Sequence, residues 1–314
     1  MKKRIIQIIV SIGLMTIILY QADLKEIGRI IKTANIPLII LSPFILFLTV
    51  FINSLKLKML LSIQGICLSF YKTFCYQIIG AFFSNFLPGT IGGDVFQTYI
   101  LKKKGFSGTK SAVAIMTTRF TEFIGMTTFF LIFLYLGYKI LTLSLINYLA
   151  KIIFFILVFI FLFSICYWQI VRHSHRFHPV IGNAICKMHN AILLYSHHKS
   201  QFVFSLALSF ITTFIWILTP YILSLSLGMK VSFFYFFIFI PLVYLISSIP
   251  ISINGIGLRE GTYTFLFYLV GVNKNIALSL GLLVSSLELF KALVGGFIYL
   301  VYKKALSIDS YQNP

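Results

Sequence analysis

Charged side chains are scarce in this chain of 314 residues: 11% of its residues are charged, whereas 59% are hydrophobic. A soluble domain carries about 25% charged residues, so the composition excludes an ordinary water-soluble enzyme or binding domain. The mean hydropathy of +0.97 agrees with this exclusion. Cysteine is also rare, and the four cysteines include no C-x-x-C pair. Their spacing indicates neither a disulfide framework nor a thiolate metal site.

Long apolar runs are what the sequence has instead. Six of them approach or exceed the length that crosses a bilayer core, at residues 36–55, 111–137, 152–171, 202–227, 232–249 and 276–301. Two shorter runs, 5–20 and 73–87, are expected to cross as well. The run at 5–20 follows three basic residues as in a signal peptide, but no small-x-small cleavage site follows it, so we expect a retained helix.

These runs predict an all-α fold, a polytopic transmembrane helix bundle of about eight spans. We expect a single membrane domain over residues 1–304, followed by a short cytoplasmic tail at 305–314. No appended soluble module is expected.

The basic residues are distributed unevenly along the chain, 26 of them against 7 acids, for a net charge of +19. With the N-terminus inside, 16 bases fall on the cytoplasmic side, seven fall on the opposite side, and three lie within or beside apolar runs. This asymmetry is the positive-inside signature and favours anionic lipids as partners. It predicts a multi-pass protein of the cytoplasmic (inner) membrane with both termini in the cytoplasm. Because no basic stripe interleaved with aromatics is present, nucleic acid is not an expected partner.

All six histidines lie in the longest loop, residues 172–199. Their run at 173–178 raises the possibility of a metal site, but no carboxylate or cysteine completes a coordination shell there. The alternative is a solvated, basic, lipid-facing loop, and we predict neither a metal nor a cofactor. Within this loop, residues 180–194 place apolar side chains on one helical face, which predicts a helix lying in the membrane interface.

Four of the seven acids fall inside or against apolar runs: Asp94, Glu122, Glu260 and Glu288. An ionised side chain at the centre of a membrane helix costs about 2.5–3.5 kcal/mol, so four without partners would cost on the order of 10 kcal/mol. Two partners are visible from helical spacing, because Arg119 precedes Glu122 by three residues and Lys291 follows Glu288 by three. Each pair shares a helix face and is expected to form an ion pair.

Arg259 and Glu260 are adjacent in the sequence, so on a helix their side chains diverge by about 100° and do not simply form an ion pair with each other. Asp94 has no partner within helical spacing. The resulting hypothesis is that Asp94 and Arg259 approach each other, or meet the same ligand, across the bundle.

The backbone is interrupted around these charges. Residues 87–94 place a proline and three glycines in an apolar stretch, and residues 249–261 repeat the pattern. Irregular backbone at membrane depth requires protein or a watery cavity to satisfy its polar groups. We therefore predict two re-entrant or broken helices, and their similar order of Ser, Pro, Gly, acid and Thr-Tyr indicates a weak internal repeat. Such interrupted segments in two halves indicate a transporter-like binding site, with helix N-termini directed at an anionic group. The alternative is that the prolines and glycines are structural kinks and the ion pairs only hold helices together.

At these residues the sequence resembles the flippase-like family that includes the transmembrane region of lysylphosphatidylglycerol synthase. The matching stretches are Phe-Ser-Asn-Phe-Leu-Pro-Gly at 83–89 with Gly-Gly-Asp at 92–94, then Arg119-x-x-Glu122, and Ile-Pro at 249–250 with Asn-Gly-Ile-Gly-Leu-Arg-Glu at 254–260. The resemblance spans nearly the whole chain and specifies no single substrate.

The resemblance implies translocation of lipids with anionic headgroups, such as aminoacylated phosphatidylglycerol or glycosylated polyprenyl phosphates. Arg119, Arg259 and Lys291 would hold the headgroup phosphate, and the four buried acids would position those bases or accept hydrogen bonds from an amine or sugar. The residues expected at the headgroup site or its cavity are Asn85, Pro88, Gly89, Gly92, Gly93, Asp94, Arg119, Glu122, Pro250, Asn254, Gly255, Gly257, Arg259, Glu260, Glu288 and Lys291.

Three functions are considered. The first is a lipid flippase without covalent chemistry. The second is an accessory protein that presents a lipid-linked substrate to a separately encoded glycosyltransferase or aminoacyl-transfer enzyme, and a homodimer is compatible with both. The third is a membrane-embedded transferase with Asp94 or Glu260 as base, which is disfavoured because no D-x-D, nucleotide loop or nucleophile constellation is present. Because no aminoacyl-transfer domain follows Lys304, we expect no enzyme and no catalytic residue.

Overall fold

The computed structural model describes residues 2–20, 22–85, 92–137, 189–249 and 251–308. Regular structure in these ranges is helical throughout, as the sequence predicts. The helices are α1 (Lys2–Tyr20), α2 (Leu24–Lys32), α3 (Ile36–Ile63), α4 (Phe70–Ser84), α5 (Gly92–Lys103), α6 (Gly108–Leu136), α9 (Lys199–Ser226), α10 (Phe233–Ser248), α11 (Leu258–Tyr268) and α12 (Lys274–Ile308). Residues 189–197 are also helical.

Four helices form the frame of the bundle, because α3, α6, α9 and α12 are each long and apolar enough to cross a membrane. With 28 residues, α3 extends about 42 Å, more than the roughly 30 Å of a hydrocarbon core. Polar side chains start two of these helices: the Asn35 side chain caps α3 and that of Ser107 caps α6. Their outer faces expose large apolar residues such as Phe44, Phe120 and Phe297, as contact with lipid requires. The polytopic membrane bundle is thereby confirmed.

Hydrogen bonds define the two ends of this bundle. At one end the Asn35 N–H donates to the Ser226 carbonyl at 2.8 Å, and the Asp23 N–H donates to Asn275 Oδ1 at 3.3 Å. The start of α3, the end of α9 and the start of α12 therefore lie together beside α2, and we call this the α2 end. At the opposite end Gln64 Nε2 donates to the Ala191 carbonyl at 2.8 Å. The end of α3 therefore lies beside the helical residues 189–197.

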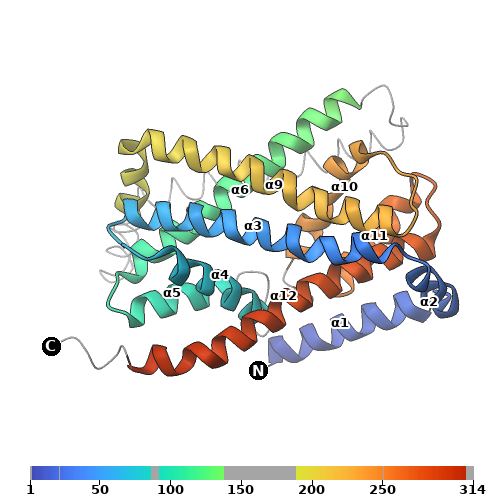
Figure 1. The fold of residues 1–314 in the computed structure, drawn as a ribbon, viewed down its shortest axis with the longest axis horizontal. Coiled ribbons are helices and arrows are strands. Elements are labelled where there is room, and N and C mark those ends of the chain that lie inside the picture. Colours follow the sequence, from blue (N-terminus) through green and yellow to red (C-terminus); the bar gives the residue numbers. More distant parts are fainter. Residues whose placement is uncertain (1, 21, 86–91, 138–188, 250, 309–314) are drawn as a thin grey trace.

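Between the long helices the chain folds into two hairpins that enter the bundle from opposite ends. The first, α4–α5, starts after α3 finishes at the opposite end and returns to that end, where α6 begins. The second, α10–α11, starts after α9 finishes at the α2 end and returns there, where α12 begins. Figure 1 shows α4 and α5 in the left half of the bundle and α10 and α11 in the right half. The two re-entrant segments are confirmed, and each half runs long helix, hairpin, long helix, in opposite orientation.

This arrangement differs from the sequence prediction at two runs. Residues 73–87 are predicted to cross the membrane, but the 15-residue helix α4 covers most of them and α5 carries the chain back to the same end. Residues 232–249 are predicted to be a complete span. The 16-residue helix α10 covers that run but is one arm of a hairpin, because α11 carries the chain back to the α2 end. Apolar length alone does not distinguish a crossing helix from an arm buried on all sides. The predicted span at 152–171 and the histidine run at 173–178 lie outside the described residues.

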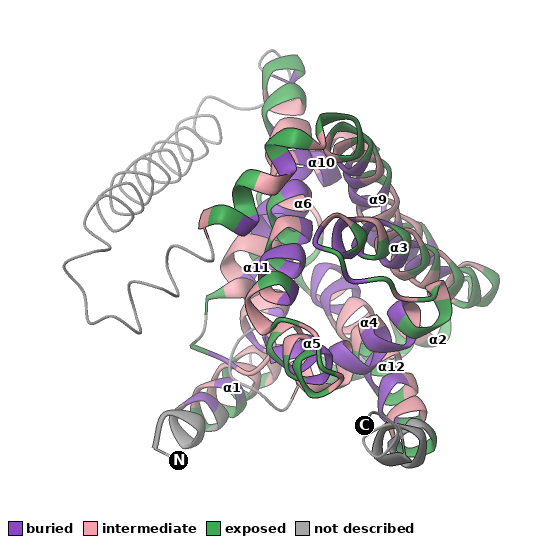
Figure 2. Ribbon diagram, turned by 90° about the vertical axis from the view of Figure 1, so that its left-hand side faces the viewer, coloured by how far each residue is buried: buried purple, intermediate pink, exposed green. Residues whose placement is uncertain are grey.

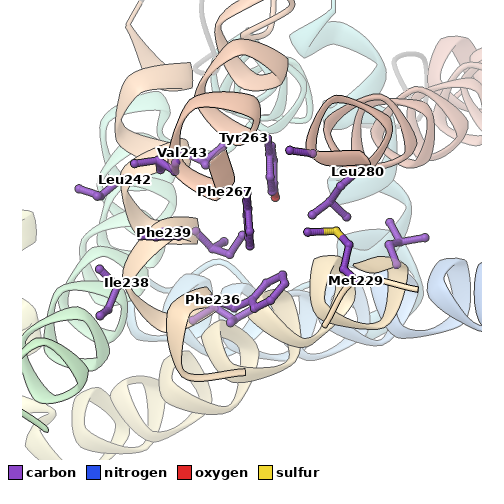
Figure 3. Close-up of a cluster of buried hydrophobic side chains, with 14 of the residues drawn as sticks. Met229, Phe236, Ile238, Phe239, Leu242, Val243, Tyr263, Phe267 and Leu280 are labelled. Carbon is purple, nitrogen blue, oxygen red and sulfur yellow. The ribbon is translucent and has the colours of Figure 1, made fainter. Parts of the chain in front are cut away.

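The second hairpin is held by an aromatic core. Figure 3 shows Phe236, Phe239 and Phe267 grouped between α10 and α11, with Leu280 of α12 opposite them. The Phe267 ring lies 4.9 Å from that of Phe236 and 5.2 Å from that of Phe239. Each of these pairs contributes about 0.5–1.5 kcal/mol beyond the burial of its area. The core therefore fixes α11 against α10 and sets where α11 begins.

The first hairpin packs through its own aromatic contact and lies against the C-terminal half of α12. The ring of Phe83 on α4 stacks on that of Phe96 on α5 at 3.8 Å. On α12, Gly295 lies so close to α4 that an added Cβ would meet the Ile78 carbonyl oxygen at 2.2 Å. Figure 2, seen along the bundle, shows buried residues turned toward its centre and exposed ones outward, with α1 at the edge.

Candidate functional site

A cavity of about 460 Å³ lies where the two hairpins meet the long helices. Cavities of this size commonly hold small ligands or the polar part of larger ones. Side chains from α3, α4, α5, α6, α9, α10, α11 and α12 contribute to its wall. Among the residues predicted from the sequence, those that line it are Asn85, Gly93, Asp94, Arg119, Glu122, Asn254, Arg259, Glu288 and Lys291.

The first hairpin closes through a glycine at a close approach of two backbones. Gly93, in the first turn of α5, lies so near α4 that an added Cβ would sit 2.4 Å from the Gly80 carbonyl oxygen. Its N–H donates to Ser84 Oγ at 3.0 Å, which satisfies one of the free donors at the helix start. This contact places the next residue, Asp94, on the cavity wall.

Asp94 and three other ionisable side chains form the first charge cluster. Arg119 donates to both carboxylate oxygens of Asp94, from Nε at 3.0 Å and from Nη2 at 2.9 Å. Its Nη1 lies 3.3 Å from Glu122 Oε2, so the predicted pair within α6 is confirmed. Lys56 Nζ reaches the other oxygen of Glu122 at 3.1 Å. The order Asp94–Arg119–Glu122–Lys56 alternates in sign and links α5, α6 and α3.

Lys56 was not identified by the sequence reasoning, which ends the first long run at residue 55 and counts this lysine among the cytoplasmic loop bases. The structure continues α3 to Ile63 and leaves the Lys56 side chain 0% exposed. A second contact comes from Ser209 Oγ at 3.0 Å. A lysine beside an apolar run usually extends to the interface, so only the tertiary position of Glu122 identifies this one as buried.

The second hairpin turns on a segment of left-handed backbone. Asn254, Gly255 and Gly257 have φ values of 48°, 77° and 84°, which favour glycine and are tolerated by asparagine. The Gly257 N–H donates to Glu260 Oε2 at 2.7 Å, and the Ser285 hydroxyl donates to Glu260 Oε1. Glu260 is 0% exposed and lies behind the cavity wall. Its geometry is that of a cap that starts α11 and ties it to α12.

Arg259 points the other way, into the cavity, as the 100° divergence from Glu260 predicts. Its Nη2 donates to the Asn254 carbonyl at 2.9 Å, and its Nη1 donates to Ser285 Oγ at 3.4 Å. Among the residues that the structure describes, no carboxylate forms an ion pair with it. Arg259 is therefore a partly buried cation on the cavity wall that retains donors for a ligand.

The predicted pair of Glu288 and Lys291 is confirmed on α12, with an N–O distance of 2.5 Å.

The two hairpins are also joined directly, because Asn254 Nδ2 donates to Asn85 Oδ1 at 2.9 Å. Gly92 begins α5, and Gly255 packs on Ser247 of α10. The predicted site residues Pro88, Gly89 and Pro250 lie outside the described residues.

The hypothesis that Asp94 and Arg259 pair directly is wrong in this structure, because both oxygens of Asp94 are held by Arg119. That partner lies 25 residues away on another helix, beyond any helical spacing rule. The hypothesis left a second possibility, a shared ligand, and both side chains do line the same cavity.

Among the described residues, the charges on the cavity wall balance. Asp94, Glu122 and Glu288 provide three carboxylates, and Arg119, Arg259 and Lys291 provide three cations. Uncharged polar side chains that the sequence reasoning did not identify fill much of the remaining wall, including Asn53, Gln77, Gln97, Thr212, Thr213, Tyr244 and Ser247. In the described part of the chain, no group of three His, Cys, Asp or Glu side chains is arranged to hold a metal ion.

Comparison with known proteins gives a consistent result. Residues 4–296 match the family described as Lysylphosphatidylglycerol synthase TM region. The chain is also 25% identical over 336 residues to the UPF0104 membrane protein PH1989 of Pyrococcus horikoshii, covering 98% of this chain and 100% of that protein. No solved structure matches the chain.

Proposed function

Since this chain belongs to the family of the lysylphosphatidylglycerol synthase transmembrane region, we propose that it binds the headgroup of a phosphate-bearing anionic lipid and moves the lipid across the cytoplasmic membrane. The headgroup would occupy the cavity between the hairpins while the acyl or prenyl chains stay in the bilayer. Both termini would lie in the cytoplasm, in keeping with the excess of basic residues in the segments on that side.

The observation that carries the proposal is the state of Arg259. Arg119 and Lys291 are each engaged by a carboxylate, whereas the hydrogen bonds of the Arg259 side chain to described residues go to a backbone carbonyl and a serine hydroxyl. A guanidinium held this way is suited to bidentate binding of a phosphate. Glu260 positions it indirectly, since Ser285 contacts both side chains.

Two helix ends support the same ligand chemistry. The helices α5 and α11 start at Gly92 and Leu258, and cavity residues lie in the first turn of each. Helix N-termini carry partial positive charge, which favours an anion. Because the hairpins enter from opposite ends, the two dipoles converge on one place within the bundle.

The opposed orientation of the halves supports movement rather than binding alone. In transporters built from inverted repeats, one half rocks against the other around a fixed site at mid-membrane. Here each half carries two acids and two bases inside the bundle, and a hydrogen bond from Asn254 to Asn85 joins the two hairpins. We infer that the chain acts without covalent chemistry, because each cavity carboxylate is held in an ion pair.

The test is lipid scrambling in proteoliposomes. Phosphatidylglycerol with a fluorescent acyl chain is reconstituted with the purified chain, and dithionite reports the fraction reaching the outer leaflet. We expect faster equilibration than in empty liposomes, and a loss of about tenfold or more in Arg259→Gln. Lys230→Gln is the matched control, because Lys230 is exposed at the α2 end outside the cavity.

Equal rates in wild-type and empty liposomes would reject translocation. If the purified chain then still bound phosphatidylglycerol through Arg259, the role of presenting a lipid-linked substrate to a separate enzyme would replace it. Equal loss of activity in Lys230→Gln would reject Arg259 as the phosphate contact.

A further inference from the structure

Within the ranges that the structure describes, three polar atoms on the cavity wall have no hydrogen-bond partner: Asn53 Oδ1, Gln97 Oε1 and Ser247 Oγ. Gln97 is 3% exposed and Ser247 is 6% exposed, so bulk water does not solvate them freely. Buried polar groups are nearly always paired, and those left open at a cavity are the groups that a ligand or ordered water would satisfy. Their positions therefore show where the cavity can form hydrogen bonds with a ligand.

Two of these atoms lie beside the first charge cluster. Asn53 precedes Lys56 by one turn of α3, and Gln97 follows Asp94 by one turn of α5. Gln97 also lines a small adjoining recess together with Asp94, Arg119 and Glu122. Carboxylates accept hydrogen bonds and do not donate, and amide oxygens do the same. Both carboxylates of this wall, formed by α3, α5 and α6, are held by Arg119 and Lys56, so the acceptors that remain for a ligand are the oxygens of Asn53 and Gln97.

Arg259 lies on a different wall. It belongs to α11, which enters from the α2 end, whereas α5 enters from the opposite end (Figure 1). Ser247 of α10 packs on Gly255 in the same break, so its open hydroxyl lies on this second wall and is free to donate. The cavity thus has a donor side at the second hairpin and an acceptor side at the first.

Because the acceptors without a partner at the first hairpin are the amide oxygens of Asn53 and Gln97, a bare phosphate would satisfy the donor side and leave these two oxygens unpaired. Building on the proposed function, we propose that the cavity selects a headgroup with two parts: a phosphate at Arg259 and a hydrogen-bond-donating group at Asn53 and Gln97. A hydroxyl or a primary ammonium provides such donors. A quaternary ammonium does not, and neither does an unsubstituted phosphate that carries full charge.

The experiment is calorimetric titration of the purified full chain with four short-chain lipids that share acyl chains and differ in headgroup. Phosphatidylglycerol supplies hydroxyls, phosphatidylethanolamine supplies a primary ammonium, phosphatidylcholine supplies no donor, and phosphatidic acid supplies phosphate alone. We expect the first two to bind about tenfold or more tightly than the last two. Comparing the two tighter ligands distinguishes the hydroxyl from the ammonium source.

The variants Asn53→Leu and Gln97→Leu remove the acceptors and should bring the four affinities to within about threefold of one another. Gln201→Leu is the matched control, since this exposed glutamine at the start of α9 lies outside the cavity and should keep the selectivity. Should the leucine variants fail to fold, Gln97→Glu retains shape and polarity. Its added carboxylate should raise the preference for the ammonium over the hydroxyl headgroup.

Equal binding of all four lipids to the wild-type chain would overturn the two-part site. So would selectivity that survives in both leucine variants, or a Gln97→Glu variant with unchanged preference. None of these results touches the proposed function, which fails separately if Arg259→Gln binds phosphatidylglycerol as tightly as the wild type does.

Discussion

Each half of the molecule places two acids and two bases inside the bundle, and the two halves connect them differently. In the first half the four side chains form one chain of contacts, from Asp94 to the fully buried Lys56. In the second half they form two separate units: Glu288 pairs with Lys291, and Glu260 caps a helix while Arg259 forms no ion pair with a described carboxylate. The difference indicates that the first cluster holds three helices together, whereas the second leaves one cation available to a ligand.

The largest expected effect comes from breaking the first cluster at Glu122. In Glu122→Gln the ammonium of Lys56, with a side chain 0% exposed, loses its carboxylate and keeps only Ser209. Leaving a buried charge unpaired costs about 3–5 kcal/mol of unfolding free energy. In Glu288→Gln, Lys291 keeps contact with the cavity, so the loss should be about 1 kcal/mol. The free energies of unfolding by SDS titration in mixed micelles measure both.

A double variant sharpens this result. Lys56→Met with Glu122→Gln removes the buried charge together with its partner, so it should be more stable than Glu122→Gln alone. If the double variant were less stable by the sum of the two single losses, Lys56 and Glu122 would not be coupled and the first cluster would not act as a unit.

A smaller effect is expected where the hairpins close. In Gly93→Ala the new Cβ would meet backbone of α4, which should cost about 1–3 kcal/mol through overpacking. Gly28→Ala in α2 is the matched control, because no atom lies within 4 Å of its added Cβ. That substitution should be neutral or stabilise by up to about 1 kcal/mol. Equal unfolding free energies for the two variants would show that the close approach of α4 and α5 at Gly93 does not contribute to stability.

Much of the architecture could be predicted from the sequence because it follows from local physics. An acid and a base three residues apart on a helix share a face, so the pairs of Glu122 and Glu288 followed from spacing alone. Proline and glycine within apolar runs predicted the breaks, since irregular backbone must be satisfied inside the bundle. The side chains of the adjacent residues Arg259 and Glu260 point in different directions, as helical geometry requires.

The rest depends on contacts between distant segments. The partner of Asp94 lies on α6, and Lys56 is buried only because Glu122 and Ser209 face it from α6 and α9. Nothing near Lys56 in the sequence distinguishes it from a lysine at the membrane interface. The unpaired atoms of Asn53 and Gln97 likewise become informative only once the cavity exists, because polar residues on membrane helices usually find partners.

The smallest expected effect concerns the hydrogen bond from Asn254 to Asn85, which joins the two hairpins. In Asn85→Ala, Asn254 loses its acceptor at 2.9 Å beside a cavity that water can enter, so the unfolding free energy should fall by only about 0.5–1.5 kcal/mol. If the hairpins move against each other, the lipid scrambling rate should fall by more than this small loss of unfolding free energy explains, because the bond is made directly between the hairpins. Asn35→Ala is the comparison, since that side chain caps α3 at the α2 end, away from the cavity. A scrambling rate that falls equally in both variants would show that the bond between the hairpins has no special part in transport.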